Sequence, residues 1–317
     1  MPVRHVVIDE HEGQRLDNFL HRELKNVPRS RIYQMVRRGE VRINGGRIAA
    51  SYRLQRGDRL RVPPVQIDPP KQSSIREETL NQIRQAVIHE DEELLVINKP
   101  VGFAAHGGSG IRHGVIEILR QIRPESTFEL VHRLDRDTSG CMLVAKTRPM
   151  LLELHAAFRE SRVKKRYDAV VAGRWPQRLR TVRHSLRRYT LQSGERRVRI
   201  DLNGDKARTD FEVQQRGINA TRLWVYPHTG RTHQIRVHAA AEGHAVLGDN
   251  KYQRDGPNIV RMMLHSSSLK VPDGRRFEAD PDGSYLETVS YTHLTLTTIL
   301  SVDLGGRRII KKKSGGG

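Results

Sequence analysis

Apolar residues recur every three or four positions in several stretches of the chain, which predicts helices there. The stretches are residues 15–20, 27–36, 115–120 and 150–160. In the second stretch Ile32, Met35 and Val36 share one face. The other face carries arginines, namely Arg29, Arg31, Arg37 and Arg38. Gly39 follows in the position where a helix usually ends.

Short apolar runs between polar turns predict strands. These runs are residues 41–44, 58–62, 93–97, 128–131, 141–145, 167–171 and 264–266. Gly45-Gly46 is expected to form the turn after the first of them. The chain therefore mixes helices with strands throughout its length.

Prolines mark the expected domain boundary. Pro63-Pro64 and Pro69-Pro70 belong to a stiff, polar stretch that cannot form a core. We expect a first domain over residues 1–62, a linker over 63–85 and a second domain over 86–280. Residues 281–317 contain SYTHLTLTT, which resembles a translated sequencing adapter. We expect this tail to be artefactual or disordered and exclude it from the fold.

Charge and composition narrow the choice of partner and compartment. The 317 residues carry 56 Lys and Arg against 36 Asp and Glu, a net charge of +20 that favours a polyanion. Aromatic residues make up only 5%, which disfavours a broad stacking platform. The chain has neither a long apolar run nor a signal-peptide core, so we expect a cytoplasmic protein without a membrane partner. The single cysteine, Cys141, excludes an internal disulfide.

The stretch from His132 to Gly140, HRLDRDTSG, concentrates acids and cations between two predicted strands. A polar loop on a rigid sheet is a common place for a catalytic group. By composition either Asp135 or Asp137 could be a nucleophile, and a plain charged hairpin is the alternative.

Three other patterns in the sequence are candidate binding sites. The glycine-rich residues 106–110 lack the Lys-Ser/Thr of a nucleotide loop, which disfavours ATP. His228, His233 and His238 lie five residues apart, a step that does not align side chains on one helix face, and we expect no metal. Residues 174–199 are rich in arginine and form either a solvated strand pair or a phosphate-binding lip.

Four motifs in fixed order give a specific resemblance. They are NKPVGFAAHGGSG, HRLDRDTSG, KKRYDAVVAG and TGRTHQIRVHAAAEGHAVLGDNKY. Together they resemble the RluA-type family of RNA pseudouridine synthases. The order RLDNFL, SRIYQMVRRGEVRING and GDRLRV resembles the S4 RNA-binding domain. The resemblance implies an α+β fold, with a small N-terminal S4-like domain and a catalytic domain on a large mixed, mainly antiparallel β-sheet.

The resemblance also implies roles for individual residues. Asp135 would be the nucleophile, Arg236 its cationic partner, and Tyr167 the residue that contacts the target base. Arg231 competes with Arg236, and Tyr167 could instead be packed in its strand. Arg133 would fill the gap left by the extruded uridine, or else be a surface charge. Further RNA contacts are expected from Lys165, Arg231 and the four arginines of the first domain.

The implied activity is conversion of uridine to pseudouridine in 23S (large-subunit) ribosomal RNA by a monomer that needs no cofactor. Transfer RNA is the alternative substrate. A non-catalytic RNA-binding ribosome-assembly factor is the alternative from another class, but such a factor needs neither Asp135 nor Tyr167. A carboxylate-nucleophile hydrolase for small substrates would leave the S4-like domain and the net charge unexplained.

Overall fold

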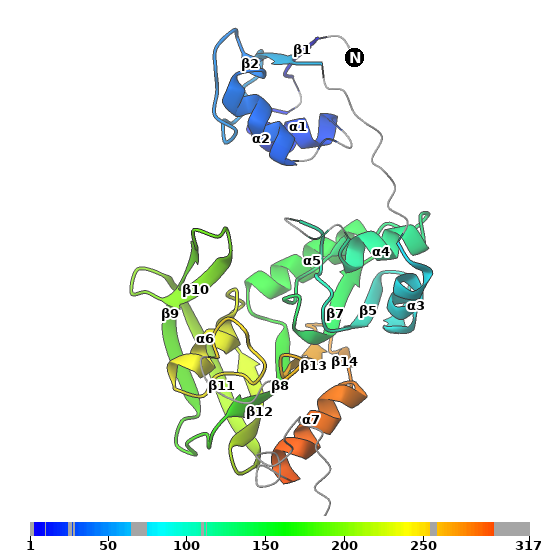
Figure 1. Cartoon of the computed structure of the whole chain (residues 1–317). Coiled ribbons are helices and arrows are strands. Elements are labelled where there is room, and N and C mark those ends of the chain that lie inside the picture. The colour runs from blue at the N-terminus through cyan, green and yellow to red at the C-terminus, as the bar shows by residue number, and fades with distance from the viewer. Residues whose placement is uncertain are drawn as a thin grey trace, which may run out of the picture. The chain divides into compact units, whose positions relative to one another are not determined.

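A computed structural model of the chain divides it into two compact units, Met1–Ser74 and Ile75–Gly317 (Figure 1). The structure describes residues 3–9, 11–24, 27, 29–64, 75–108, 111, 113–253 and 259–294, without the side chains of 29, 30 and 291–294. The two units are described separately below.

The first unit packs two helices on a small sheet. Its elements are β1 (Arg4–Val7), α1 (Leu16–Glu23), α2 (Arg29–Arg38), β2 (Arg42–Ile43) and β3 (Arg59–Val62), with strand order β1-β3-β2. Ile32, Met35 and Val36 are buried, so the predicted apolar face of α2 forms part of the core. Both predicted helices are present, whereas the sequence pattern did not predict β1.

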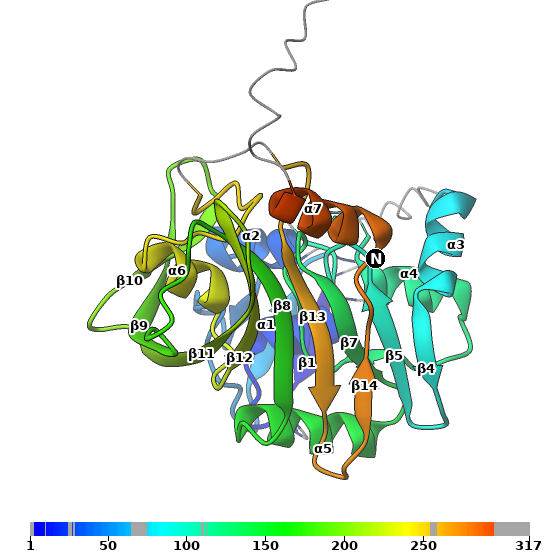
Figure 2. The same ribbon diagram turned by 90° about the horizontal axis from the view of Figure 1, so that it is seen from below.

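The second unit is built on one sheet of eleven strands. The strands are β4 (Val87–Glu90), β5 (Leu94–Lys99), β6 (Glu129–Leu130), β7 (Ser139–Ala145), β8 (Lys164–Ala172), β9 (Thr181–Thr190), β10 (Arg196–Ile200), β11 (Asp205–Arg216), β12 (Ala220–Pro227), β13 (Leu264–Lys270) and β14 (Arg276–Glu278). The main order is β10-β9-β11-β12-β8-β13-β7-β5-β4, with β14 beside β13 and β6 beside β7 (Figure 2).

Only one pair of neighbours in this described sheet, β7 and β13, runs parallel. The expected fold, mixed and mainly antiparallel, is therefore confirmed. The parallel pair brings the start of β7 beside the start of β13, where Ser139 lies opposite His265. Since β8 flanks β13 on its other side, three separate parts of the chain meet at this point of the sheet.

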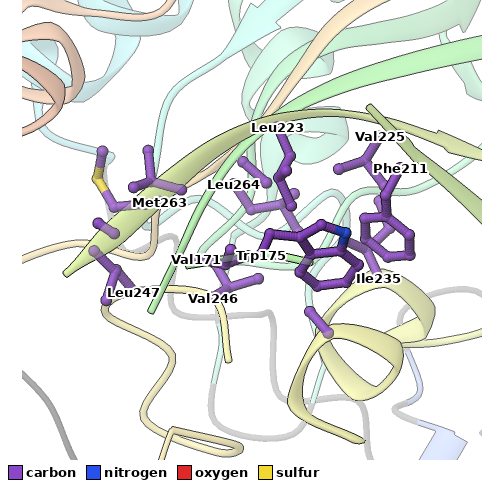
Figure 3. Packing of buried hydrophobic residues seen from close by; sticks show 14 of the residues in the cluster. Val171, Trp175, Phe211, Leu223, Val225, Ile235, Val246, Leu247, Met263 and Leu264 are labelled. Atoms are coloured by element: carbon purple, nitrogen blue, oxygen red, sulfur yellow. The ribbon is translucent and has the colours of Figure 1, made fainter. Parts of the chain in front are cut away.

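Helices pack on the sheet. They are α3 (Glu77–Gln85), α4 (Val115–Ile122), α5 (Arg148–Arg159), α6 (Gln234–Ala241) and α7 (Gly283–Leu294). The ring of Trp175 packs 4.5 Å from that of Phe211, and Leu223 and Ile235 join them in the core (Figure 3). This cluster fixes α6 against the strands, because Ile235 lies on that helix. None of the helices that the structure describes is both long and apolar enough for a membrane span.

Two segments differ from the sequence predictions. The expected linker, residues 63–85, contains α3, whose Leu80 and Ile83 are buried against α4 because their three-residue spacing puts them on one face. The expected tail, 281–317, contains α7. Its Tyr285 is fully buried and donates a hydrogen bond to Asp168 Oδ1 at 3.1 Å. Tyr285 and Val289, four residues apart, form an apolar face that joins the core.

Candidate active site

The HRLDRDTSG segment forms a loop that joins β6 to β7. Leu134 is buried in the core, and Thr138 donates its backbone N–H to the Asp135 carbonyl at 3.1 Å. Gly140 ends the loop with φ +110°, where a Cβ atom would lie 2.3 Å from the Ser266 carbonyl oxygen. Only glycine fits both that backbone angle and that close approach. The loop is thereby seated directly against β13.

Two basic side chains hold the loop, the half-buried His132 and the buried Lys99. His132 accepts a hydrogen bond at Nε2 from the Leu143 N–H at 3.0 Å, and burial lowers its pKa to about 3, which keeps it neutral. Lys99 donates from Nζ to the Phe103 carbonyl at 2.7 Å and to the Arg136 carbonyl at 3.2 Å. Burial lowers the pKa of Lys99 to about 7. These contacts tie the backbone next to Asp135 to the end of β5.

The guanidinium of Arg236 holds the Asp135 carboxylate. Arg236 lies in the first turn of α6, and its Nη1 donates to Asp135 Oδ2 at 3.2 Å. Its Nε and Nη2 donate to the two carboxylate oxygens of Asp249, each at 2.7 Å. Burial opposes the charge on Arg236, but Asp249 and then Asp135 outweigh it and raise its pKa above the ordinary value. The cation at Asp135 is therefore permanent and fixed in place.

Tyr167 and Lys165 lie two residues apart on β8, so both side chains point to the same face of the sheet. Both line one cleft together with Arg133, Asp135 and Arg236. Burial raises the pKa of Tyr167 to about 12, so its phenol carries a proton at neutral pH. Burial lowers the pKa of Lys165 to about 8. The cleft thus combines one carboxylate with cations and a protonated phenol.

The geometry distinguishes the competing residues. Asp137 pairs with Arg136 at 2.9 Å and does not line the cleft. Arg231 lines the cleft but lies toward Asp205, with Nη1 3.9 Å from that carboxylate. Asp135 and Arg236 are therefore the acid and the guanidinium that meet. Arg133 is exposed at the cleft, with no ion pair within the described part of the chain.

The remaining candidates lie in the first unit. Arg37 and Arg38 are exposed, whereas Arg31 pairs with Glu40 at 3.0 Å. The side chain of Arg29 lies outside the described residues. These arginines belong to a different compact unit from Asp135.

Sequence reasoning did not identify two residues of the cleft region. Lys99 was not singled out, although it lies in the first of the four motifs, NKPVGFAAHGGSG. His233 was considered only as a metal ligand, yet it lines the cleft with Nε2 3.7 Å from Asp135 Oδ2. Its place in the GRTHQIR segment, three residues before Arg236, was the available signal.

Comparison with known proteins identifies the family of the chain. Residues 93–241 match the family model described as RNA pseudouridylate synthase, and residues 14–60 match the S4 domain. Ribosomal large subunit pseudouridine synthase C of Haemophilus influenzae is 45% identical over 296 residues, which cover 90% of each chain. The protein of that name from Escherichia coli (strain K12) is 45% identical over 270 residues, covering 81% of this chain and 85% of that protein.

Among solved structures, human RNA pseudouridylate synthase domain containing 4 shares the fold with a TM-score of 0.58 at 22% identity, covering 67% of this chain and 95% of that one. The resemblance inferred from the four motifs is confirmed by the sequence relatives. The chain belongs to the RNA pseudouridylate synthase family, an enzyme family of isomerases, and carries an S4 domain at its N-terminus.

Proposed function

We propose that this protein converts uridines of large-subunit ribosomal RNA to pseudouridine, with Asp135 as the nucleophile. The observation that carries the assignment is the Asp135 carboxylate, which the buried Arg236 holds at 3.2 Å in a cleft lined by Tyr167. A guanidinium favours the ionised carboxylate and fixes its direction, as a carboxylate nucleophile requires.

The reaction is an isomerisation. The N1–C1′ bond of the uridine breaks, the uracil turns, and a C5–C1′ bond forms while C5 loses a proton and N1 gains one. Two routes are open to Asp135: addition to C1′ of the ribose or addition to C6 of the base. Both need an ionised carboxylate and a base that has left the RNA stack, and neither consumes an oxidant or a cofactor.

Tyr167 supports the handling of the base. Its ring can stack on a uracil, and its hydroxyl can take part in proton transfer. Because burial raises its pKa to about 12, the phenol enters the reaction as a proton donor rather than as a phenolate. Arg133, exposed at the cleft, is suited to fill the space that the extruded uridine leaves.

The distribution of cations supports an RNA substrate. Arg183 lies directly opposite Arg208 on β9 and β11, and Arg187 lies opposite Arg199 on β9 and β10. Asp201 pairs with both Arg187 and Arg199, and Asp210 pairs with Arg208, so two carboxylates offset part of the charge of the four guanidinium groups. The remaining positive charge is suited to a polyanion. We propose that these arginines, with Lys165 and Arg231 at the cleft, bind phosphates. The S4 unit, with Arg31 and its exposed neighbours, would supply a second contact to folded RNA.

The names of the bacterial relatives support ribosomal over transfer RNA, since both are large-subunit ribosomal enzymes by name. The test is to incubate large-subunit RNA and transfer RNA transcripts with the protein and with Asp135→Asn, and then to map pseudouridine. The expected result is new pseudouridine in ribosomal RNA with the wild type and none with Asp135→Asn, which still binds the RNA. Modification of transfer RNA alone would overturn the substrate, and turnover by Asp135→Asn would overturn the nucleophile.

A further inference from the structure

His233 occupies a strained position at the cleft. Its backbone lies in the left-handed region, with φ 53° and ψ 20°, immediately before α6. This conformation is unfavourable for a residue with a side chain. Gln234 holds it there: its Oε1 accepts from Thr229 Oγ1 at 2.6 Å and from the Arg231 N–H at 3.0 Å. A costly backbone conformation that its neighbours enforce at a site indicates that the side chain's direction matters.

A hydrogen-bond chain fixes which ring nitrogen of His233 carries the proton. The Val198 N–H donates to the Tyr252 hydroxyl oxygen at 2.9 Å, and that oxygen lies 2.7 Å from His233 Nδ1. Burial raises the pKa of Tyr252 to about 12, so the hydroxyl keeps its own proton. Among the described residues Nδ1 is the acceptor within hydrogen-bond distance of that hydroxyl, so the hydroxyl donates to Nδ1. The imidazole proton is therefore on Nε2.

That Nε2–H faces the reacting carboxylate without bonding to it. Nε2 lies 3.7 Å from Asp135 Oδ2, beyond hydrogen-bond distance, whereas Arg236 Nη1 reaches the same oxygen at 3.2 Å. Among the described residues no hydrogen bond involves His233 Nε2 or Asp135 Oδ1. The side chain of His233 is 10% exposed and lines the cleft. A donor and a carboxylate oxygen thus remain available side by side.

We propose that His233 is a further catalytic residue, whose Nε2–H donates a hydrogen bond to a carbonyl oxygen of the uracil held at Asp135. This rests on the proposed function. Addition of the carboxylate to C6 moves an electron pair onto O4, and cleavage of N1–C1′ leaves the pair on N1, shared with O2 and O4. Negative charge therefore builds on a uracil carbonyl by either route, and a preorganised donor stabilises it.

The His233 imidazole is a neutral donor beside the Asp135 carboxylate. Burial lowers the pKa of His233 to about 4, although the charge of Asp135 raises it; Arg236 and Lys251 lower it further and Asp249 raises it. The imidazole is therefore uncharged at neutral pH and does not form a second ion pair with Asp135. A second ion pair would lower the reactivity of the carboxylate. The same turn supplies both supports, since Asp249 holds Arg236 and Tyr252 holds His233.

The tautomer can be measured without any substrate. In protein labelled with ¹⁵N in the histidine rings, His233 is assigned from the signals that disappear in His233→Asn. The expected spectrum shows a neutral ring at pH 6 with its proton on Nε2. In Tyr252→Phe the shift of Nδ1 changes because its donor is gone. A proton on Nδ1, or titration of the ring near pH 6.5, overturns the inference whatever the enzyme's activity.

Kinetics test the contribution to the reaction. Asparagine accepts a left-handed backbone readily, so His233→Asn removes the imidazole with little strain. We expect about a 100-fold lower single-turnover rate of pseudouridine formation, with RNA affinity and melting temperature unchanged. His228→Asn is the matched control, because His228 is exposed, pairs with Asp210 and does not line the cleft. Its rate is expected to equal that of the wild type.

A double-mutant cycle separates the chain of contacts from a general structural effect. Tyr252→Phe is expected to lower the rate by about 10-fold in the wild type and not at all in His233→Asn. The reason is that both changes act through the proton on His233 Nε2. A His233→Asn rate within twofold of the wild type, or fully additive losses, overturns the inference. If the wild type forms no pseudouridine in any RNA, the proposed function fails instead, and the ring spectrum still decides the assignment of the donor.

Discussion

The guanidinium group of Arg236 donates hydrogen bonds to two carboxylates, those of Asp249 and Asp135. Two of its nitrogens lie 2.7 Å from the oxygens of Asp249, and the third lies 3.2 Å from Asp135 Oδ2. The side chains of Arg236 and Asp249 are 4% and 0% exposed, so this buried ion pair holds the guanidinium in place. Asp135, at 22% exposure, is the partner that is open to the cleft.

Replacement Arg236→Lys is expected to lower the rate of pseudouridine formation by about 100-fold or more. A lysine is a single point donor and cannot hold both Asp249 and Asp135 in a planar, paired geometry. Single-turnover assays measure the change, with Arg162→Lys as control because Arg162 is exposed, pairs with Glu160 at 2.8 Å and does not line the cleft. A lysine variant as fast as the wild type would contradict a role for the planar guanidinium group that bonds both carboxylates.

Replacement Tyr167→Phe is expected to slow turnover about 100-fold while it leaves the fold and RNA affinity intact. The change removes only the hydroxyl, so ring stacking is kept and proton transfer is lost. The measurement is the single-turnover rate beside a binding isotherm for the same RNA. Normal kinetics would leave Tyr167 with a stacking role alone.

Acid should destabilise the second unit partly through His132. Its pKa is about 3 in the folded protein and about 6.5 when unfolded, so the unfolded chain binds the extra proton. Its contribution to stability is complete above pH 6.5 and is lost as the pH falls toward 3, by up to about 1.4 kcal/mol per pH unit. Urea unfolding of His132→Gln is expected to show a smaller decrease in the free energy of unfolding between pH 7 and pH 5 than the wild type shows. His155→Gln, at an exposed site on α5, should follow the wild type.

Replacement Tyr285→Phe is expected to lower the free energy of unfolding by about 1 kcal/mol. The lost hydroxyl donates to the buried Asp168, which also accepts from Arg222 Nε at 3.0 Å. Thermal melting measures the loss, and Leu286→Ala on the exposed side of α7 should stay within about 0.5 kcal/mol of the wild type. Equal stability of Tyr285→Phe and the wild type would mean that α7 does not contribute through this contact.

RNA binding is expected to weaken steeply with added salt, because phosphate contacts release counterions. Replacing Arg183 or Arg188 with alanine should each reduce the slope of log affinity against log salt by about 1, because both are exposed and neither forms an ion pair among the described residues. Arg275→Ala is the control, since Arg275 already pairs with Asp273 at 2.7 Å and Asp91 at 2.9 Å. A flat salt response of the wild type would exclude the arginines of β9 and β10 as a phosphate-binding surface.

Local patterns predicted much of this molecule. The apolar spacing of Ile32, Met35 and Val36 gave α2, and α5 followed from the same rule, because one buried face is visible in the order of residues. The motif around Asp135 named the acid that the structure places beside Arg236. Such features depend on a few neighbouring residues and can be predicted without knowledge of the tertiary contacts.

Contacts between distant segments were not predictable in this way. The position of β13 between β7 and β8 depends on pairing across most of the second unit, which no local period reveals. Lys99 is buried, unlike most lysines, because three backbone carbonyls happen to converge on it. α7 was missed because its segment was taken as foreign, although Tyr285 and Val289 already had helical spacing.

The insertion of β13 between two strands that precede it in the chain has a consequence for synthesis on the ribosome. Until Lys270 has emerged, β7 and β8 each lack a neighbour, and the loop with Asp135 lacks Ser266 beneath Gly140. Strand pairing between remote segments is also a slow step. A nascent chain halted before that strand therefore already carries Asp135, Tyr167 and Arg236, but the loop with Asp135 is not yet seated against β13.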